Sequence, residues 1–139
     1  MQRTDDDRFE GMHCTILVQR RAPGVLVLVI KGMDVGELGD APFRALEGEM
    51  AGEGLIEFFV DARDTRGASV SVSSDWAVWL RRHKHRFRHI SMLVGSPFIK
   101  LTADFVRRFA DLDDLMRIYT DRAAFDGALS NAVGNAGSL

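Results

Sequence analysis

Short apolar runs alternate with segments of helical spacing along most of this chain. The first two runs, Met12–Arg20 and Val25–Lys31, are separated by a Pro-Gly turn, which predicts an antiparallel hairpin. The second run is apolar at successive positions, as expected for a strand that is buried on both faces of a sheet. Three later runs predict further strands over Leu55–Val60, Ile90–Val94 and Leu115–Tyr119.

Helical spacing predicts four helices around these later strands. The first covers Ala41–Ala51, and the second starts at a serine cap, Ser73 or Ser74, and runs to about Arg88. The third covers Phe98–Ala110 and the fourth Arg122–Leu129. The side of the third helix that we expect to be buried contains Ile99, Leu101, Phe105, Val106 and Phe109.

The predicted order of elements is β-β-α-β-α-β-α-β-α. Single strands that alternate with helices indicate an α/β fold with a mixed, mostly parallel sheet, here of five strands. Residues 12–130 are expected to form a single domain, which suits a chain of 139 residues. The polar segment 1–11 is predicted to be a disordered tail, and the small residues of segment 131–139 a flexible one.

Composition narrows the class of protein. The hydrophobic fraction is 46% and the charged fraction 27%, as in ordinary globular proteins, and the net charge of −2 gives no general attraction to nucleic acid. The single cysteine, Cys14, allows no internal disulfide and is expected to be a buried, inert thiol. Without a long apolar run, no membrane-spanning helix is expected. We therefore expect a cytoplasmic protein.

The segment Glu57–Leu80 predicts the functional end of the sheet. An apolar strand ends at Asp61, a polar loop follows, and serines precede an amphipathic helix. Open α/β sheets bind ligands where strands lead into helix N-termini. Asp61 and Asp64 offer a minor possibility of acid–base catalysis, but loop ion pairs with Arg63 and Arg66 are the simpler interpretation.

Other motifs give little chemistry. Gly32, Gly36 and Gly39 lack the spacing of a dinucleotide-binding loop, and His85 and His89 have no third metal ligand at a suitable spacing. We therefore predict no catalytic residue, metal or cofactor. A basic run on the second helix is expected to form a solvated face or a weak anion-binding face. The residues of that face are Arg81, Arg82, Lys84, His85 and Arg88.

Three segments resemble the STAS superfamily, which includes anti-sigma factor antagonists and a SpoIIAA-like branch. Val25–Gly32, followed by Met33 and Asp34, resembles the second strand of the family. Phe59-Val60-Asp61 resembles its third strand, which ends in an aspartate. Ser73-Ser74 falls where a serine motif begins the second helix in the family, although Val72 replaces the acid before it. The resemblance spans about Ile16–Leu129.

This resemblance implies a non-enzymatic bacterial regulatory module that docks to a protein, such as an anti-sigma factor or a kinase. It also implies that phosphorylation of Ser73 or Ser74 modulates docking, and it leaves a homodimer open. A phosphate at this position would be stabilised by the positive end of the helix dipole. The alternative is that the serines only cap the helix. The implied contact surface consists of Asp34, Asp61, Arg63, Asp64, Arg66, Ser71, Asp75 and Trp76.

A rival hypothesis is a small-ligand or lipid-binding module, because some SpoIIAA-like proteins resemble the lipid-carrying CRAL-TRIO fold. Its pocket would be lined by Trp76, Trp79, Phe98 and Phe105. The two hypotheses differ in what they expect of the structure. An interaction module predicts an exposed serine loop and no enclosed cavity, whereas a ligand module predicts an apolar pocket of a few hundred Å³.

Overall fold

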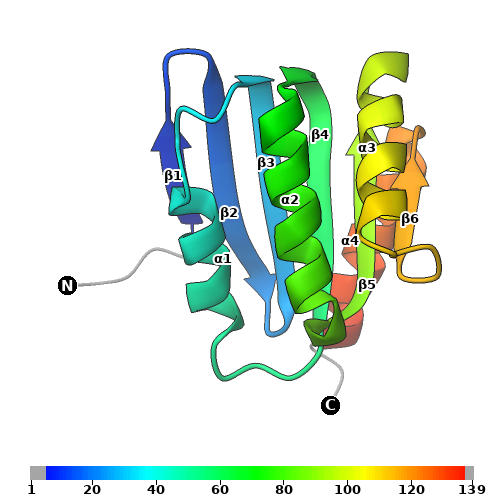
Figure 1. Ribbon diagram of the computed structural model, residues 1–139. Helices are drawn as coiled ribbons and strands as arrows, with labels where there is room; N and C mark the ends of the chain where they lie inside the picture. The colour runs from blue at the N-terminus through cyan, green and yellow to red at the C-terminus, as the bar shows by residue number, and fades with distance from the viewer. Residues whose placement is uncertain (1–5, 137–139) are drawn as a thin grey trace.

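A central sheet with helices on both faces makes up residues 6–136, which are the residues that the structure, a computed structural model, describes (Figure 1). The strands are β1 (Asp6–Glu10), β2 (Cys14–Ala22), β3 (Val25–Asp34), β4 (Ile56–Ala68), β5 (Phe87–Val94) and β6 (Met116–Tyr119). The helices are α1 (Ala41–Met50), α2 (Val70–His83), the short 3-10 helix η1 (Lys84–Arg86), α3 (Pro97–Phe109) and α4 (Arg122–Ala136).

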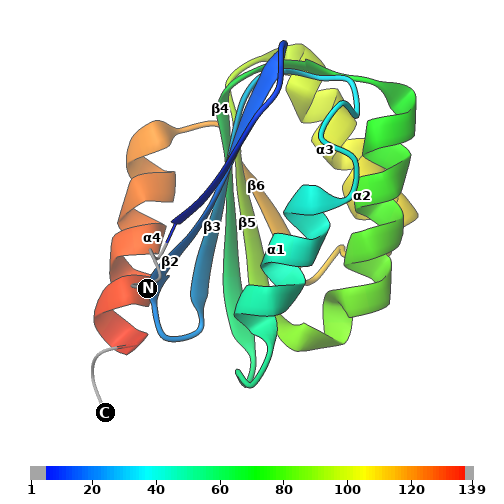
Figure 2. The same cartoon turned by 90° about the vertical axis from the view of Figure 1, so that its left-hand side faces the viewer.

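The six strands lie in the sheet in the order in which they occur along the chain. The β1–β2 and β2–β3 pairs are antiparallel, and the three pairs from β3 to β6 are parallel. Helices α1, α2 and α3 cover one face, and α4 covers the other (Figure 2). The mixed, mostly parallel α/β fold predicted from the sequence is therefore confirmed, with six strands in place of five.

Strand β3 shows why the second apolar run has no polar face. Leu26 and Leu28 are buried in the core beneath α1–α3, whereas Val25 and Val27 are buried beneath α4. A strand with helices on both sides of it must present apolar side chains in both directions. The predicted hairpin with β2 is confirmed, and its turn places Gly24 at a φ of 74°.

The first strand corrects the prediction that residues 1–11 form a disordered tail. Asp6–Glu10 pairs antiparallel with β2, and Phe9, opposite Ile16, packs against the main core. Arg8 and Glu10 are exposed, so the segment alternates as a half-buried edge strand does. One aromatic side chain in a charged segment was too weak a signal to predict this strand. The rest of the predicted tail, residues 1–5, lies outside the described residues.

Strand β4 is longer than predicted and removes the polar loop expected after Asp61. The strand continues to Ala68 because β3 also continues, and the pairing reaches Asp34 opposite Ala68. Irregular register near Gly32 accommodates the extra length; Gly32 has a φ of 90°, and a Cβ there would collide with the His13 carbonyl. The prediction was wrong because the second half of β4 is rich in polar residues, which are typical of loops.

Helix α2 starts and ends earlier than predicted. Its cap is Ser69, which has an extended backbone and whose side-chain Oγ accepts the Val72 N–H at 3.2 Å, so neither Ser73 nor Ser74 is the cap. The helix ends at His83, and β5 begins at Phe87 rather than at Ile90. The basic run 81–88 therefore crosses a helix end, a 3-10 turn and the start of a strand.

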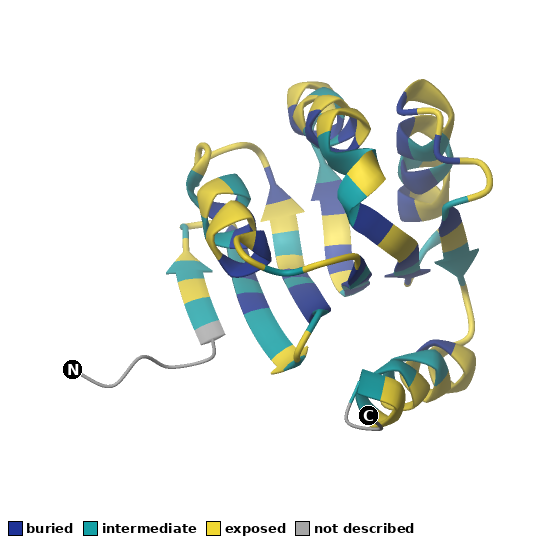
Figure 3. Ribbon diagram, turned by 90° about the horizontal axis from the view of Figure 1, so that it is seen from below, coloured by how far each residue is buried: buried dark blue, intermediate teal, exposed yellow. Residues whose placement is uncertain are grey.

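Helix α4 continues to Ala136, well beyond the predicted end at Leu129 and into the segment predicted to be flexible. Its small and apolar side chains, including Ala132 and Val133, pack on the second core, whose centre is Phe125. Because of this packing, residues 131–136 are helical, although their small side chains had predicted a flexible segment. The end of that segment, residues 137–139, lies outside the described residues. Figure 3 shows buried positions of the helices facing the sheet and exposed positions facing away.

Candidate functional site

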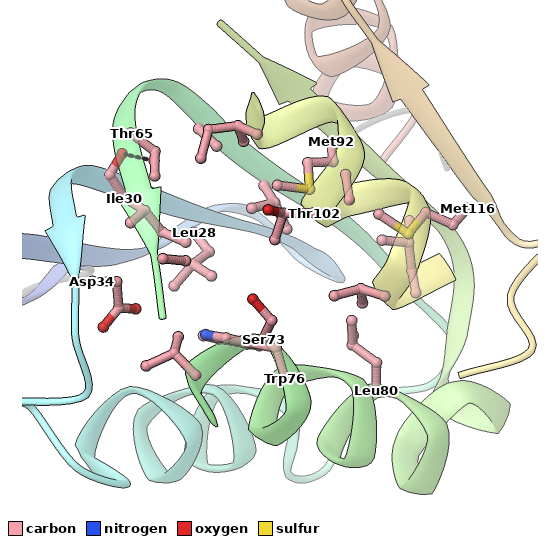
Figure 4. A pocket seen from close by; sticks show the side chains of 18 of the residues that line it. Leu28, Ile30, Asp34, Thr65, Ser73, Trp76, Leu80, Met92, Thr102 and Met116 are labelled. Atoms are coloured by element: carbon pink, nitrogen blue, oxygen red, sulfur yellow. Dashed lines mark hydrogen bonds between the residues drawn. The ribbon is translucent and has the colours of Figure 1, made fainter. Parts of the chain in front are cut away.

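An apolar cavity of about 70 Å³ lies between the sheet and the helices α2 and α3 (Figure 4). Strand residues such as Leu28 and Met92 line one side of it, and Leu80 of α2 and Ala103 of α3 line the other. Since one water position needs roughly 10–15 Å³, the cavity holds roughly five to seven water-sized groups. It is therefore large enough for a short alkyl chain and smaller than the pocket expected of a lipid carrier.

Small side chains of α3 leave this space open. The side chains that α3 buries are Ile99, Ala103 and Val106, together with the alanine that follows the helix. Three of the residues predicted to be buried are instead exposed: Leu101 at 69%, Phe105 at 44% and Phe109 at 49%. The correction has a simple cause, because both sides of α3 carry apolar residues at helical spacing and the side with small residues faces the sheet.

The exposed side of α3 forms an apolar stripe, defined here as Phe98, Leu101, Phe105 and Phe109. Phe98 is 58% exposed, and the rings of Phe105 and Phe109 stack at 5.6 Å between centroids. The four positions repeat every three or four residues, so they share one side of the helix. Large apolar side chains grouped in this way typically mark a surface that meets another molecule.

Of the four aromatic residues predicted to line a pocket, only Trp76 lines this cavity. Trp79 is buried in the core beside α1, where its indole nitrogen donates to Glu47 at 2.8 Å. Phe98 and Phe105 belong to the exposed stripe. The sequence could not show this division, because tryptophan and phenylalanine at helical spacing suit a core, a pocket or a contact surface equally well.

Asp34 is the charged residue at the edge of the cavity. Its side chain is 5% exposed, and its Oδ1 accepts the Gly36 backbone N–H at 3.1 Å. Burial, with a smaller contribution from the nearby Glu37 carboxylate, raises the pKa of Asp34 above its usual range. Asp34 also borders a second hollow, between the loop before α1 and the start of α2, and Trp76 lines both spaces.

Three hydroxyl groups complete the polar lining of the cavity. Thr65 of β4 donates to the Ile30 carbonyl at 2.7 Å, Ser73 of α2 to the Ser69 carbonyl at 3.1 Å, and Thr102 of α3 to the Phe98 carbonyl at 3.3 Å. The sequence analysis did not single out Thr65 or Thr102. Thr65 lies in the segment that was predicted to be a polar loop, so its place in strand β4 was not anticipated.

The two predicted phosphorylation candidates lie in different environments. Ser73 is 8% exposed and faces the cavity, so its hydroxyl is not at the surface. Ser74 is half-buried on the next position of α2. Ser71 is exposed, and its Oγ lies 3.2 Å from that of the capping Ser69. No exposed serine loop precedes α2, since β4 leads into Ser69 directly.

The predicted contact surface is divided among several places. Asp61 and Arg63 pair at 2.9 Å, and Arg63 also pairs with Asp126 of α4 at 2.6 Å, which ties β4 to the helix on the opposite face. Asp64, Arg66, Ser71 and Asp75 are exposed. Asp34 and Trp76 alone among the predicted residues line the cavity. The junction is therefore the polar edge of the cavity rather than a single charged surface.

The predicted basic face is likewise divided. Arg81, Arg82 and His85 are exposed, and Lys84 pairs with Asp111 at 3.4 Å. Arg88 is in β5 rather than in the helix and borders a hollow beside α4. These residues do not form one anion-binding surface, because the helix on which their spacing was counted ends at His83.

Several other groups stay outside this site. Cys14 is buried, and burial raises the pKa of its thiol to about 12, which suits an inert thiol. Within residues 6–136, no three His, Cys, Asp or Glu side chains come together as metal ligands would. In the same part of the chain, no helix is both long and apolar enough to cross a membrane.

Comparisons with known proteins agree with the fold. A scan against protein families and a search of curated proteins give no match. Among solved structures, the chain is similar to an uncharacterized protein of the DUF3478 family with a SpoIIAA-like fold from Shewanella loihica PV-4. The identity is 16%, the TM-score is 0.62, and the match covers 87% of this chain and 98% of the other. The chain thus has a SpoIIAA-like fold, as the STAS resemblance implied.

Proposed function

We propose that this protein is a non-enzymatic binding module that holds an apolar ligand between the sheet and helices α2 and α3. The observation that carries this proposal is the apolar cavity, which is bounded by four strands and two helices. A well-packed core closes over such space, since each empty volume forfeits dispersion contacts and costs stability. A cavity kept open by Ala103 and Ser73 is therefore more readily explained by a ligand than by packing.

The position of the cavity supports the same function. It lies beneath α3, whose outer side is the exposed apolar stripe, so the same helix carries apolar residues on the side of the cavity and on the side of the solvent. The cavity volume of about 70 Å³ limits the enclosed part of the ligand to a short chain.

The test is binding of hexan-1-ol, followed by two-dimensional NMR of the isotopically labelled protein. We expect saturable shifts at residues lining the cavity, such as Leu28 and Ala103, and their loss in Ala103→Leu, which fills the space. Arg108→Ala, an exposed position of the same helix outside the apolar stripe, is the matched control and should bind as the wild type does. Unchanged binding in Ala103→Leu, or no saturable shift in the wild type, would contradict the proposal.

Docking to a protein partner is the second candidate, and the apolar stripe on α3 favours it. This candidate includes the bacterial, cytoplasmic regulatory role that the STAS resemblance implies, with an anti-sigma factor or kinase as partner. It predicts that Leu101→Asp abolishes co-purification of a specific partner from the native cell, whereas Arg122→Gln, an exposed position on α4 at the opposite face, retains it.

Regulation by phosphate can be tested in the same assay. Of the two candidate serines, Ser74 is the more accessible, so Ser74→Asp and Ser74→Ala are the informative variants. A partner that is lost with Ser74→Asp and kept with Ser74→Ala would support a switch. Equal recovery with both variants would remove the switch and leave docking itself intact.

A further inference from the structure

Each hydroxyl group around the cavity already donates a hydrogen bond to the protein backbone. Thr65, Ser73 and Thr102 each donate to a backbone carbonyl, at 2.7, 3.1 and 3.3 Å respectively. A hydroxyl whose proton is engaged in this way can only accept a further hydrogen bond. All three side chains line the cavity, whose surface is almost entirely apolar, so they face it mainly through carbon atoms and offer a ligand no donor.

Asp34 adds a stronger acceptor at one edge. An ionised carboxylate has about four acceptor positions, and within the described residues the structure gives this one a single donor, the Gly36 N–H at 3.1 Å. Asp34 as a residue is 5% exposed, so its second oxygen keeps only a small contact with water. A buried carboxylate with so few donors is unfavourable unless something else supplies them.

Trp76 supplies the one side-chain donor that the described lining residues direct toward this end. Figure 4 shows its indole nitrogen on the side of the cavity where Asp34 lies, and the Ser73 hydroxyl close to it. Within residues 6–136, the structure shows no acceptor for this N–H. A ligand group beside Asp34 that donates to the carboxylate can also accept from Trp76, as an alcohol oxygen does.

The polar groups therefore select a type of ligand head. Resting on the proposed function, we propose that the ligand is an apolar molecule that ends in a hydrogen-bond donor, an alcohol or a primary amine, bound by Asp34 at the edge of the cavity. A carboxylate head is rejected, because it meets the like charge of Asp34 at the edge of the cavity and finds no side-chain cation among the residues that line it. Molecules of the fatty-acid type are thus outside the specificity of this site.

The test compares three probes with the same chain, hexylamine, hexan-1-ol and hexanoate, by NMR titration of the wild-type chain at about pH 7.5, where a carboxylate and an alkylamine are both ionised. We expect hexylamine and hexan-1-ol to bind at least about tenfold more tightly than hexanoate, since a buried like-charge contact readily costs that factor. The amine and alcohol titrations also show which of the two donor heads is preferred.

Substitution of Asp34 then assigns the selectivity. Asp34→Asn keeps an oxygen for the Gly36 N–H and removes the charge, so the preference for hexylamine over hexanoate should fall to about threefold or less. Asp64→Asn, which removes an exposed charge on β4, should keep the full preference. The NMR spectra of both variants show directly whether they are folded.

The outcomes separate this inference from the proposed function. If no probe gives saturable shifts in the cavity, the ligand-binding function itself is wrong, and the inference fails with it. If all three probes bind with similar affinity, or if Asp34→Asn keeps the wild-type preference, the cavity binds ligands but the donor-head selectivity is wrong. Both results come from the wild-type chain and one conservative variant.

Discussion

The two faces of the sheet are covered in different ways. On the α4 face, Phe125 is fully buried and meets Phe59 and Tyr119 edge to face, at 5.7 and 5.8 Å between ring centroids. On the opposite face, α3 turns its aromatic side chains outward and presents Ala103 to a cavity. Helix α4 thus closes its face with a large aromatic residue, whereas α3 leaves a cavity above a part of the sheet, although Phe58, Trp79 and Phe87 are buried elsewhere on that face.

This difference separates the aromatic side chains that stabilise the core from those that lie at the surface. Aromatic side chains contribute most to stability where they are fully buried in edge-to-face contact, which is where α4 places them. The exposed aromatic side chains of α3 contribute little to the core, so they are free to serve binding. The predictions below test this division, and each pairs a change on one face with a change elsewhere.

The largest effect is expected for Phe125→Ala. Removing a fully buried phenylalanine from the α4 face should lower the free energy of unfolding by about 3–5 kcal/mol. Phe109→Ala, at a position that is 49% exposed on α3, should change it by about 1 kcal/mol or less. Urea unfolding followed by circular dichroism measures both. Similar losses in the two variants would contradict the contrast between the faces.

A second pair compares two alanines that are both fully buried, Ala77 of α2 and Ala103 of α3. Ala77 does not line the cavity, so Ala77→Leu overpacks the core and should cost about 1–3 kcal/mol. Ala103→Leu places its added atoms in the cavity and should cost about 1 kcal/mol or less. Thermal unfolding of the two variants measures the difference, and an equal loss would mean that the cavity is not available space.

The arrangement of strands was predictable because it depends on long apolar runs. Val25–Lys31, apolar in both directions, had to be a central strand, and the alternation of strands with helices implied a parallel sheet beyond it. The STAS resemblance pointed to the junction of β4 and α2, from which Thr65 and Ser73 line the cavity, whereas Asp61 does not. The resemblance could not predict how far each side chain is buried. Ser73 is buried and the adjacent Ser74 is half-buried, although the two serines are neighbours in the sequence.

The end of β4 and the buried side of α3 were mispredicted for the same reason. The extension of β4 through Arg63 and Arg66 is polar, and only its pairing with β3 makes it a strand. Helix α3 has apolar residues on two sides, and the choice between Leu101 and Ala103 as the buried position depends on the room above the sheet. Pairing partners and available room are tertiary properties, so neither can be read from the periodicity of a single segment.

A third, smaller effect concerns the charge at the open face. Asp34→Asn keeps the hydrogen bond from Gly36 and removes a buried carboxylate, so it should raise the free energy of unfolding at neutral pH by about 1 kcal/mol. A carboxyl whose pKa is raised on folding favours the folded state only below its unfolded pKa, and this contribution is lost as pH rises through the folded pKa. The gain from Asp34→Asn should therefore be present at neutral pH and vanish below the ordinary pKa of 3.8.

Urea unfolding at several pH values measures this gain, with Asp64→Asn as the exposed control. A variant that is no more stable than the wild type at neutral pH would mean that the Asp34 carboxylate is adequately solvated. If the variant is both more stable and less selective for donor-headed probes, the open face has kept a destabilising group for the sake of binding. Binding sites commonly combine these two properties.

The smallest effect is expected for the ion pair that ties β4 to α4. Asp126 is exposed and pairs with Arg63 at 2.6 Å, while Arg63 keeps its second partner, Asp61, at 2.9 Å. Asp126→Asn should therefore cost only about 0.5 kcal/mol, and the cost should disappear in 1 M salt, where the Debye length is about 3 Å. A loss above about 2 kcal/mol, or one that salt does not reduce, would show that the closed face depends on this pair as well as on Phe125. Unfolding of the wild type and the variant at low and high salt distinguishes these outcomes, because screening weakens the charge pair and leaves the aromatic contacts of Phe125 unchanged.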